Sequence, residues 1–466
     1  MNLSNPCPVT RERLQALKVT LSSKNLKAHF GEELQTRYCK RVPMQLAIWF
    51  VVGVGLFSSD AYRQIFRWLT PLGTTVPGSS TLTEVRKRVG YELIEKLYLL
   101  TVRLLGTAKN QIGFYQGMRL MGVDGFTLNL FDSKENRKHF GRPKNGRCYG
   151  PFPQARCVAL CELGTHVMWR TSIGKYSQGE QSLLKKLFRF VTSEMLVLLD
   201  RNFLSFEIAR EITSQKANFL IRCKSNRVLP VLKRLSDGSY LSRIYASQYD
   251  QKMDRNGIDV RVIEYTLDDP NRVGSGELHR LVTSLLDHRE HPADQLIMLY
   301  HQRWEAELAF DELKTHLTER AVLRSQRPDG VLQEIYALLI SHFIIRKISF
   351  DASMKANVQP RRISFTATYK ILKSKLLEAS LFSDVKRWYQ LIVAEAAKEV
   401  LPERDGRINP RVLKKTTSAW TKKRDKHRKP KQPETEFEES IVILVSAVLG
   451  FSRKDDAIVE WVPPKD

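Results

Sequence analysis

Cysteine is scarce in this sequence and is never arranged as a zinc site or a disulfide framework would need. The 466 residues hold six cysteines, and only Cys157 and Cys161 lie close together. No second Cys or His pair follows at the spacing of a structural zinc site. We therefore expect reduced thiols in a reducing compartment at all six positions, Cys7, Cys39, Cys148, Cys157, Cys161 and Cys223.

Apolar runs long enough to cross a membrane are also missing. The longest extends from Leu46 to Phe57 and is shorter than the ~20 residues that a bilayer-spanning helix needs. A second run, from Ile441 to Phe451, fails for the same reason. The first stretch of the chain lacks a charged segment followed by an apolar one, so we expect no signal peptide. We expect no membrane partner, and we expect the first run to form a buried helix.

Acidic residues are outnumbered by basic ones. Lys and Arg total 75 against 50 Asp and Glu, which leaves a formal charge of +25. Such an excess favours a polyanionic partner, with nucleic acid first and an anionic membrane surface second. A merely soluble basic protein is the remaining alternative. The 42% of hydrophobic residues excludes global disorder, and the length suggests two to four domains.

The spacing of apolar residues divides the chain into five parts. Helical periodicity dominates the beginning, a β-β-β-α-β-α-β order follows, and turn-rich short strands precede a second helical part. This order predicts an α/β fold with a mixed sheet and helices on its faces. The expected parts are a helical domain 1–110, a core 111–224, a β-rich insertion 225–290, a second core part 291–350, and a C-terminal region 351–466.

Two regions carry clustered basic residues. A helix expected to open with a capping box at Thr81 carries Arg86, Lys87 and Arg88, which either contact DNA or form a solvated basic face. The stretch 136–156 interleaves cations with aromatic rings, as backbone binding combined with base stacking would require, or it is a mobile solvated hairpin. A basic tail over 404–431 is a generic polyanion-binding arm.

Two aspartates stand where strands are expected. Asp124 lies inside the apolar stretch LMGVDGFTL, and Asp200 ends the apolar run EMLVLLD. A carboxylate in such a place is costly unless it is paired, hydrogen-bonded or bound to a metal. Each alone could be an ordinary turn-capping residue. Two of them in neighbouring strands favour a shared site.

A third acid belongs to the stretch YHQRWEAELAFDELK, residues 300–314. On an α-helix of ~100° per residue, Tyr300, Arg303, Glu307 and Lys314 fall within about 60° of one another, on one polar stripe. The alternative is an exposed, salt-bridged helix face. Asp311 lies on the same stripe and competes with Glu307 on geometry, whereas Glu305 and Glu312 point away from it.

These residue types suit displacement at phosphorus. Two divalent ions can activate the attacking oxygen and stabilise the leaving oxygen of a phosphodiester. Mg²⁺ prefers oxygen ligands, and a few carboxylates from different elements supply them. Arginine, lysine and tyrosine side chains can hold the phosphates of the substrate.

The spacing Y-x2-R-x3-E-x6-K, with Tyr300, Arg303, Glu307 and Lys314, resembles the signature of bacterial DDE transposases of the insertion-sequence-four family. Other blocks resemble the same family, among them VDGFTLNLFDSKENRKHFGRP, LLDRNF and LRSQRPDGVLQEIYALL. The resemblance covers roughly residues 10–430.

The resemblance implies a ribonuclease-H-like catalytic core, with Asp124, Asp200 and Glu307 as catalytic residues and ligands of two Mg²⁺ ions, for which Mn²⁺ can substitute. It implies that Tyr300, Arg303 and Lys314 hold DNA phosphates. The expected partners are double-stranded DNA, as terminal inverted repeats and target, and a second copy of the chain in a synaptic complex. The implied location is the bacterial cytoplasm, at the nucleoid.

The function expected from these residues is metal-dependent cleavage at the ends of an insertion element, followed by strand transfer. One alternative is a catalytically inactive DNA-binding protein descended from such an enzyme. Another is a stand-alone nuclease that shares the site but does not join strands. The intact set of acids and the intact stripe favour the active transposase.

Overall fold

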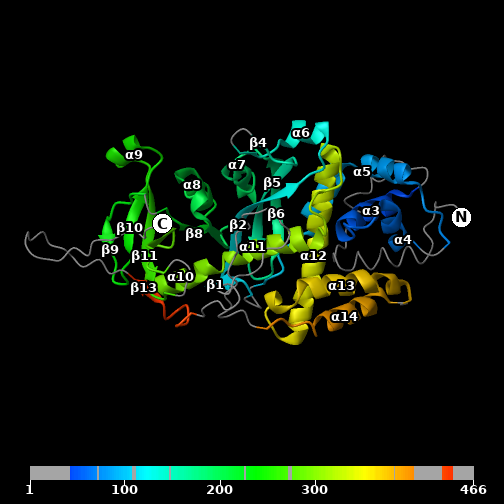
Figure 1. The fold of residues 1–466 in the computed structure, drawn as a ribbon. Helices are drawn as coiled ribbons and strands as arrows, with labels where there is room; N and C mark the ends of the chain where they lie inside the picture. Colours follow the sequence, from blue (N-terminus) through cyan, green and yellow to red (C-terminus); the bar gives the residue numbers. More distant parts are fainter. Residues whose placement is uncertain are drawn as a thin grey trace, which may run out of the picture.

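One large sheet forms the centre of the molecule, with helices on both faces and a helical body at one end (Figure 1). The computed structural model describes residues 42–70, 73–107, 112–145, 148–224, 227–270, 275–381, 384–402 and 433–443. The basic tail 404–431, Arg147, Cys7 and Cys39, and most of the apolar run that begins at Ile441 lie outside the described residues.

Five strands make the core of the sheet, in the order β6-β5-β2-β7-β8. They are β2 (Met118–Asn129), β5 (Gln154–Glu162), β6 (Val167–Lys175), β7 (Met195–Leu199) and β8 (Asn218–Arg222). The pairs β6·β5 and β5·β2 are antiparallel, and the pairs β2·β7 and β7·β8 are parallel. This arrangement confirms the mixed α/β sheet and the ribonuclease-H-like core.

Helices cover both faces because the central strands are apolar on both sides. Every residue of β7 is buried, as a strand between two helical layers requires. One face carries α7 (Glu180–Lys185) and α8 (Phe206–Ser214), and the other carries α10 (Ala293–His301) and α11 (Trp304–Asp311) (Figure 1). The long helix α12 (Pro328–Ala356) joins this second layer to the helical body.

The residues predicted as a β-rich insertion continue the same sheet. In the described residues the order runs on from β8 through β12 (His279–Thr283), β11 (Ile258–Leu267) and β10 (Tyr240–Ile244) to β9 (Lys233–Arg234). β12 pairs antiparallel with β8, so the insertion covers an edge that would otherwise expose unpaired backbone groups. The predicted domain boundaries themselves stay predictions.

The remaining described elements are short strands and peripheral helices. They are β1 (Phe114–Tyr115), β3 (Lys144–Asn145), β4 (Cys148–Tyr149), β13 (Ile441–Ile443), α4 (Tyr62–Leu69), α6 (Lys134–Phe140), α9 (Gln248–Lys252), α13 (Phe365–Lys375) and α14 (Val385–Ala396). Short 3-10 turns occupy Phe188–Phe190, Arg201–Phe203, Pro360–Arg362 and Leu376–Leu381.

The helical body is built on α3 (Met44–Leu56), which contains most of the longest apolar run of the sequence. Every residue of α3 except Gln45 is buried, and the helix packs on α12 beside α5 (Ser79–Thr101). The expectation of a buried helix is confirmed. Among the described helices none combines the length and the apolar character that crossing a membrane takes.

The basic cluster of α5 is divided by the fold. Arg86 is buried and donates hydrogen bonds to Gln333, Ser325 and the Gly330 carbonyl, so it joins α5 to the start of α12. Lys87 is exposed and pairs with Glu84 at 2.6 Å. Arg86 therefore belongs neither to a DNA-contacting surface nor to a solvated basic face, and its role is structural. The helix begins at Ser79, before the predicted capping box.

Helix α3 approaches α12 closely at Gly55. A Cβ on Gly55 would overlap the carbonyl oxygen of Ala337, which is backbone and cannot turn aside. Gly78, by contrast, has only the Ser80 hydroxyl oxygen near its Cβ position, at 3.9 Å.

We expect Gly55→Ala to lower the free energy of unfolding by about 1–3 kcal/mol, because one of the two helices must shift. Gly78→Ala, at the N-cap of α5, is a control without a backbone clash and should lower the melting temperature less. Thermal unfolding followed by circular dichroism measures both. Equal melting temperatures for the two variants would contradict the close approach of α3 and α12.

Candidate active site

The register of two parallel strands brings the first two acids together. In the pairing of β2 with β7, Val123 lies opposite Leu199. Asp124 and Asp200 are the next residues of the two strands, so both emerge at the same edge of the sheet. Asp124 stays within β2, where its Oδ1 accepts a hydrogen bond from the Gly125 amide at 2.7 Å. Asp200 leaves β7 and begins a 3-10 turn.

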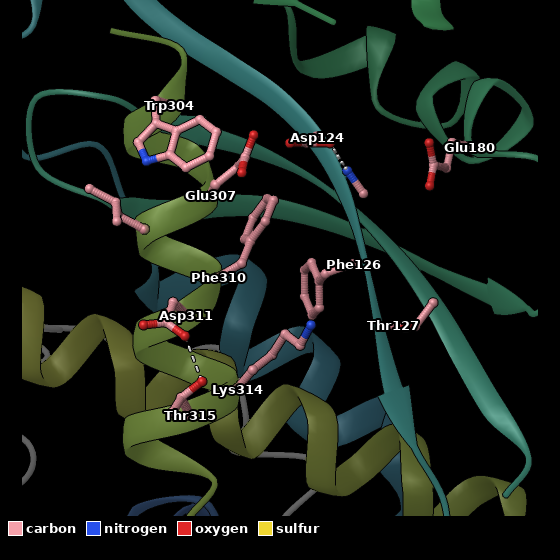
Figure 2. Close-up of a pocket in the computed structure, with 12 residues that line it drawn as sticks. Asp124, Phe126, Thr127, Glu180, Trp304, Glu307, Phe310, Asp311, Lys314 and Thr315 are labelled. Atoms are coloured by element: carbon pink, nitrogen blue, oxygen red, sulfur yellow. Dashed lines mark hydrogen bonds between the residues drawn. The ribbon is translucent and has the colours of Figure 1, made fainter. Parts of the chain in front are cut away.

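Glu307 reaches this edge from α11, which packs on β2. Figure 2 shows its carboxylate facing Asp124 across the gap between helix and strand. The Arg303 guanidinium connects the two acids, because Nη1 donates to Asp124 Oδ2 at 3.1 Å and Nη2 donates to Glu307 Oε1 at 3.1 Å. Both acids and the arginine are mostly buried.

The charges of Glu307 and Asp200 both act on Asp124. Burial raises the pKa of Asp124, the Gly125 amide and Arg303 oppose that rise, and the charges of Glu307 and Asp200 add to it. For Arg303, burial acts to lower the pKa, but the negative groups around it outweigh burial and raise the pKa. Three carboxylates around one guanidinium leave an excess of negative charge, which further cations would balance.

Hard oxygen donors of this kind suit the Mg²⁺ ions that the sequence resemblance implies. The chemistry of Asp124, Asp200 and Glu307 therefore fits the ions. Within the described ranges, no three acidic, His or Cys side chains already stand as a metal-ligand cluster. The Arg303 guanidinium lies between Asp124 and Glu307 and pairs with both.

A cavity of about 720 Å³ opens in front of the acids. Strand β2 lines it from Asp124 to Thr127, and the helical side contributes Glu307 and Lys314 (Figure 2). A smaller hollow of about 90 Å³ shares Thr127 and Lys314 with this cavity and continues to Arg320. Lys314 is exposed and reaches from the helix toward β2, where it lines the cavity.

The prediction that one continuous α-helix carries the polar stripe from Tyr300 to Lys314 is wrong. Helix α10 ends at His301 and α11 begins at Trp304, with tight turns between them, and a π-helix (Glu312–Leu317) follows α11. The hydrogen bonds Arg303 N to Tyr300 O and Ala306 N to Arg303 O, each 3.0 Å, mark these turns. Angles counted at α-helical spacing therefore do not hold from Tyr300 to Lys314.

Tyr300 lies apart from the cavity. Its side chain is buried, burial raises the pKa of its phenol, and its hydroxyl donates to the Leu199 carbonyl at 3.2 Å. The phenol thus holds the last residue of β7, directly before Asp200. The structure brings Asp124, Glu307 and Arg303 together, while the phosphate-binding role of Tyr300 stays a prediction.

The competing acid Asp311 lines the cavity without joining the other acids. Its Oδ1 accepts from the Thr315 hydroxyl at 2.6 Å, and its Oδ2 lies 3.6 Å from His316 Nε2. These partners belong to the π-helix that follows Asp311. Glu307, not Asp311, is the acid of this helical stretch that shares a guanidinium with Asp124.

Two cavity residues were missed from the sequence. Glu180, at the start of α7, places its carboxylate against Gly125, and a Cβ on Gly125 would lie 2.6 Å from its Oε1. Trp304 presents a 43% exposed ring at the cavity (Figure 2). No spacing in the sequence marks Glu180. Trp304 directly follows Arg303 in the sequence, and this adjacency is the one local signal for it.

Comparisons with known proteins identify the family. The family model described as "Transposase DDE domain" matches residues 115–344, and the model described as "Insertion element 4 transposase N-terminal" matches residues 20–99. The chain is 24% identical over 398 residues, 80% of its length and 86% of the relative's, to "Transposase InsG for insertion sequence element IS4" of Escherichia coli (strain K12).

Two further similarities are more distant. "Putative transposase InsZ" of Escherichia coli (strain K12) is 24% identical over 203 residues, which are 42% of this chain and 64% of that protein. Among solved structures, the "piggyBac transposase synaptic complex with hairpin DNA" aligns with a TM-score of 0.39 and 15% identity, over 86% of this chain and 84% of that one.

We expect Tyr300→Phe to lower the free energy of unfolding by about 0.5–1.5 kcal/mol, because the buried Leu199 carbonyl loses its hydrogen bond. Urea denaturation measures this loss. DNA affinity should be unchanged at every salt concentration, since the hydroxyl is used inside the fold. A weaker dependence of affinity on salt in this variant would instead support the phosphate-binding role.

Proposed function

This chain belongs to the DDE transposases of the insertion-sequence-four family, and we propose that it cleaves the ends of its insertion element and joins them to target DNA. The observation that carries the proposal is the convergence of Asp124 and Glu307 on one guanidinium, with Asp200 beside them at the edge of the sheet. A cavity of about 720 Å³ opens in front of Asp124 and Glu307.

We propose Asp124, Asp200 and Glu307 as the ligands of two Mg²⁺ ions, with Mn²⁺ able to replace them. When bound, the ions activate the attacking oxygen and stabilise the leaving oxygen of the phosphodiester. The chain itself places the three carboxylates on elements of a packed sheet and helix layer, which fixes their spacing. Their partial burial lowers the local dielectric constant, which strengthens each interaction with the substrate.

Cations around the acids hold the phosphates in this proposal. Lys314 supplies a mobile point charge at the cavity, and Arg303 can offer a planar pair of donors once it leaves the carboxylates. The exposed Trp304 ring can stack on a base beside the scissile phosphate. Because the carboxylates repel an anionic DNA strand, the reaction depends on these cations as well as on the ions.

Double-stranded DNA is the proposed partner, both as the terminal inverted repeats of the element and as target. Lys138 and Lys144 are exposed on the basic stretch 136–156, and Lys144 lies 5.6 Å from the exposed Tyr149 ring. Such surfaces bind phosphate and stack on bases. We further propose a homodimer on paired ends, acting at the nucleoid of the bacterial cytoplasm.

We expect Asp124→Asn, Asp200→Asn and Glu307→Gln each to reduce Mg²⁺-dependent cleavage of a labelled element end at least a hundredfold, because each removes an ion ligand. Gel electrophoresis of the labelled duplex measures the rate. Asp311→Asn is the control on the same helical stretch and should keep most of the activity.

Two outcomes would contradict the assignment. Cleavage that persists in all three variants would remove the acids from the reaction. Loss of cleavage in Asp311→Asn with retention in Glu307→Gln would exchange the roles of those two residues.

The wild-type protein distinguishes the alternative functions. If it binds the ends but neither cleaves nor joins them, the inactive DNA-binding alternative is supported. Cleavage without joining would support the nuclease.

We expect Lys314→Ala to weaken binding of the element end and to reduce the slope of log affinity against log salt by about 0.9, since one phosphate contact is lost. Fluorescence anisotropy of a labelled duplex in buffer with EDTA measures the slope without cleavage. An unchanged slope would show that Lys314 does not contact phosphate.

A further inference from the structure

A buried group of charged side chains lies under the helical stretch that carries Glu307 and Lys314. Its centre is Glu312, the first residue of the π-helix, which is 7% exposed. The sequence places Glu312 away from the polar stripe, and the structure shows what it contacts instead. Its partners come from two other parts of the chain, the turn between β5 and β6 and the middle of α12.

Three side chains surround the Glu312 carboxylate. Arg346 of α12 donates to it from both Nε, at 2.7 Å, and Nη2. His342, one turn earlier on α12, places Nε2 at 3.1 Å from Oε2. His166, in the turn between β5 and β6, places Nδ1 at 2.8 Å from Oε1. His166 Nδ1 also accepts a hydrogen bond from Arg346 Nη2 at 2.9 Å. The ion pair of Glu312 with Arg346 therefore ties the π-helix to α12, and Arg346 extends the connection to the turn between β5 and β6.

His166 also contacts the first part of the helical stretch, at Glu305. His166 Nε2 lies 2.7 Å from Glu305 Oε2, and Glu305 also pairs with Arg361 at 3.2 Å. Glu305 and Glu312 stand on either side of Glu307 in the sequence. The helical stretch that carries the third acid is thus held at two points on its inner side.

The charges in this group balance. Two carboxylates, Glu305 and Glu312, face two guanidinium groups, Arg346 and Arg361. Burial lowers the pKa of His166 to about 4, with Arg346 adding to the shift. The other histidine of the group is neutral too, since burial lowers the pKa of His342 to about 3.

Stability alone does not account for such a group. Desolvation makes buried ion pairs expensive, and apolar residues of the same volume are often equally or more stabilising. A buried pair does fix the direction of the element that carries it, because its geometry is specific. Glu312 stands at the point where the α-helix α11 changes into a π-helix.

Lys314 is part of the π-helix. A π turn places one more residue between hydrogen-bonded groups than an α turn does, and such turns often occur at functional sites. Here Thr318 N donates to Leu313 O at 3.0 Å, and the Ser58 hydroxyl binds the carbonyls of Leu317 and Thr318 at the end of the turn. With Glu312 held inward, Lys314 lines the cavity together with Asp124.

We propose that Glu312, through its ion pair with Arg346, is a positioning residue that directs the Lys314 ammonium group to the substrate phosphate beside Asp124. The inference rests on the proposed function, because it needs Lys314 to bind phosphate. Glu312 itself touches neither the cavity nor the reacting groups. Its removal should act on DNA binding only through Lys314.

A double-mutant cycle tests this coupling. Glu312→Gln combined with Arg346→Met removes both charges and leaves no uncompensated buried charge. Salt titrations of a labelled duplex carrying the terminal repeat, in EDTA, should show a slope reduced by about 0.9, as for Lys314→Ala alone. Adding Lys314→Ala to the double variant should then change neither slope nor affinity.

A second buried pair provides the matched control. Arg261 and Asp237 form an ion pair in the β-rich part of the sheet, away from the helical stretch, and Arg261 is fully buried. Asp237→Asn with Arg261→Met removes a pair of the same type. In that background Lys314→Ala should still reduce the slope by about 0.9.

The outcomes separate the two proposals. If Lys314→Ala keeps its full effect in the Glu312→Gln, Arg346→Met background, the positioning role is wrong while the phosphate contact stands. If Lys314→Ala has no effect in the wild-type protein, the phosphate contact is wrong, and the positioning role falls with it. If the double variant does not fold, Glu312→Asp decides, because it keeps the charge and shortens the side chain by one methylene group. Undiminished Lys314 dependence in Glu312→Asp would overturn the inference.

Discussion

The parallel pairing of β2 with β7 is the constraint on which the site depends. It sets Val123 opposite Leu199, and the two aspartates follow as the next residues of their strands. A shift of one residue would turn Asp124 to the other face of the sheet, because side chains alternate along a strand. Strand β7 lies between β2 and β8 and is buried along its whole length.

The contacts of Arg303 depend on that register. Two acids fixed at one edge, with Glu307 facing them from α11, need a cation, and the guanidinium supplies it by bonding Asp124 and Glu307 together. Arg303 thus links the Asp124 carboxylate of β2 to the Glu307 carboxylate of α11. Behind it, the buried pair of Glu312 and Arg346 fixes the helical stretch to α12.

Much of this could be predicted from the sequence, because apolar periodicity and spacing are local properties. They indicated the mixed sheet, the buried α3 helix, and strands that place Asp124 and Asp200 at one site. The continuous helix from Tyr300 to Lys314 was wrong, since tight turns and a π-helix, stabilised by contacts with other elements, interrupt the α-helical spacing. No local pattern reports such contacts.

The residues of the site divide in the same way between what the local sequence indicates and what contacts between distant elements set. By itself the sequence determined which acids and cations are present and in what order, and it marked Glu307 rather than Asp311 through its signature. Only the tertiary structure decided that Tyr300 binds the Leu199 carbonyl and that Arg86 is buried against α12. The reason is physical, because burial and hydrogen-bond partners are set by residues far away in the chain, whereas residue identity and spacing are set along it.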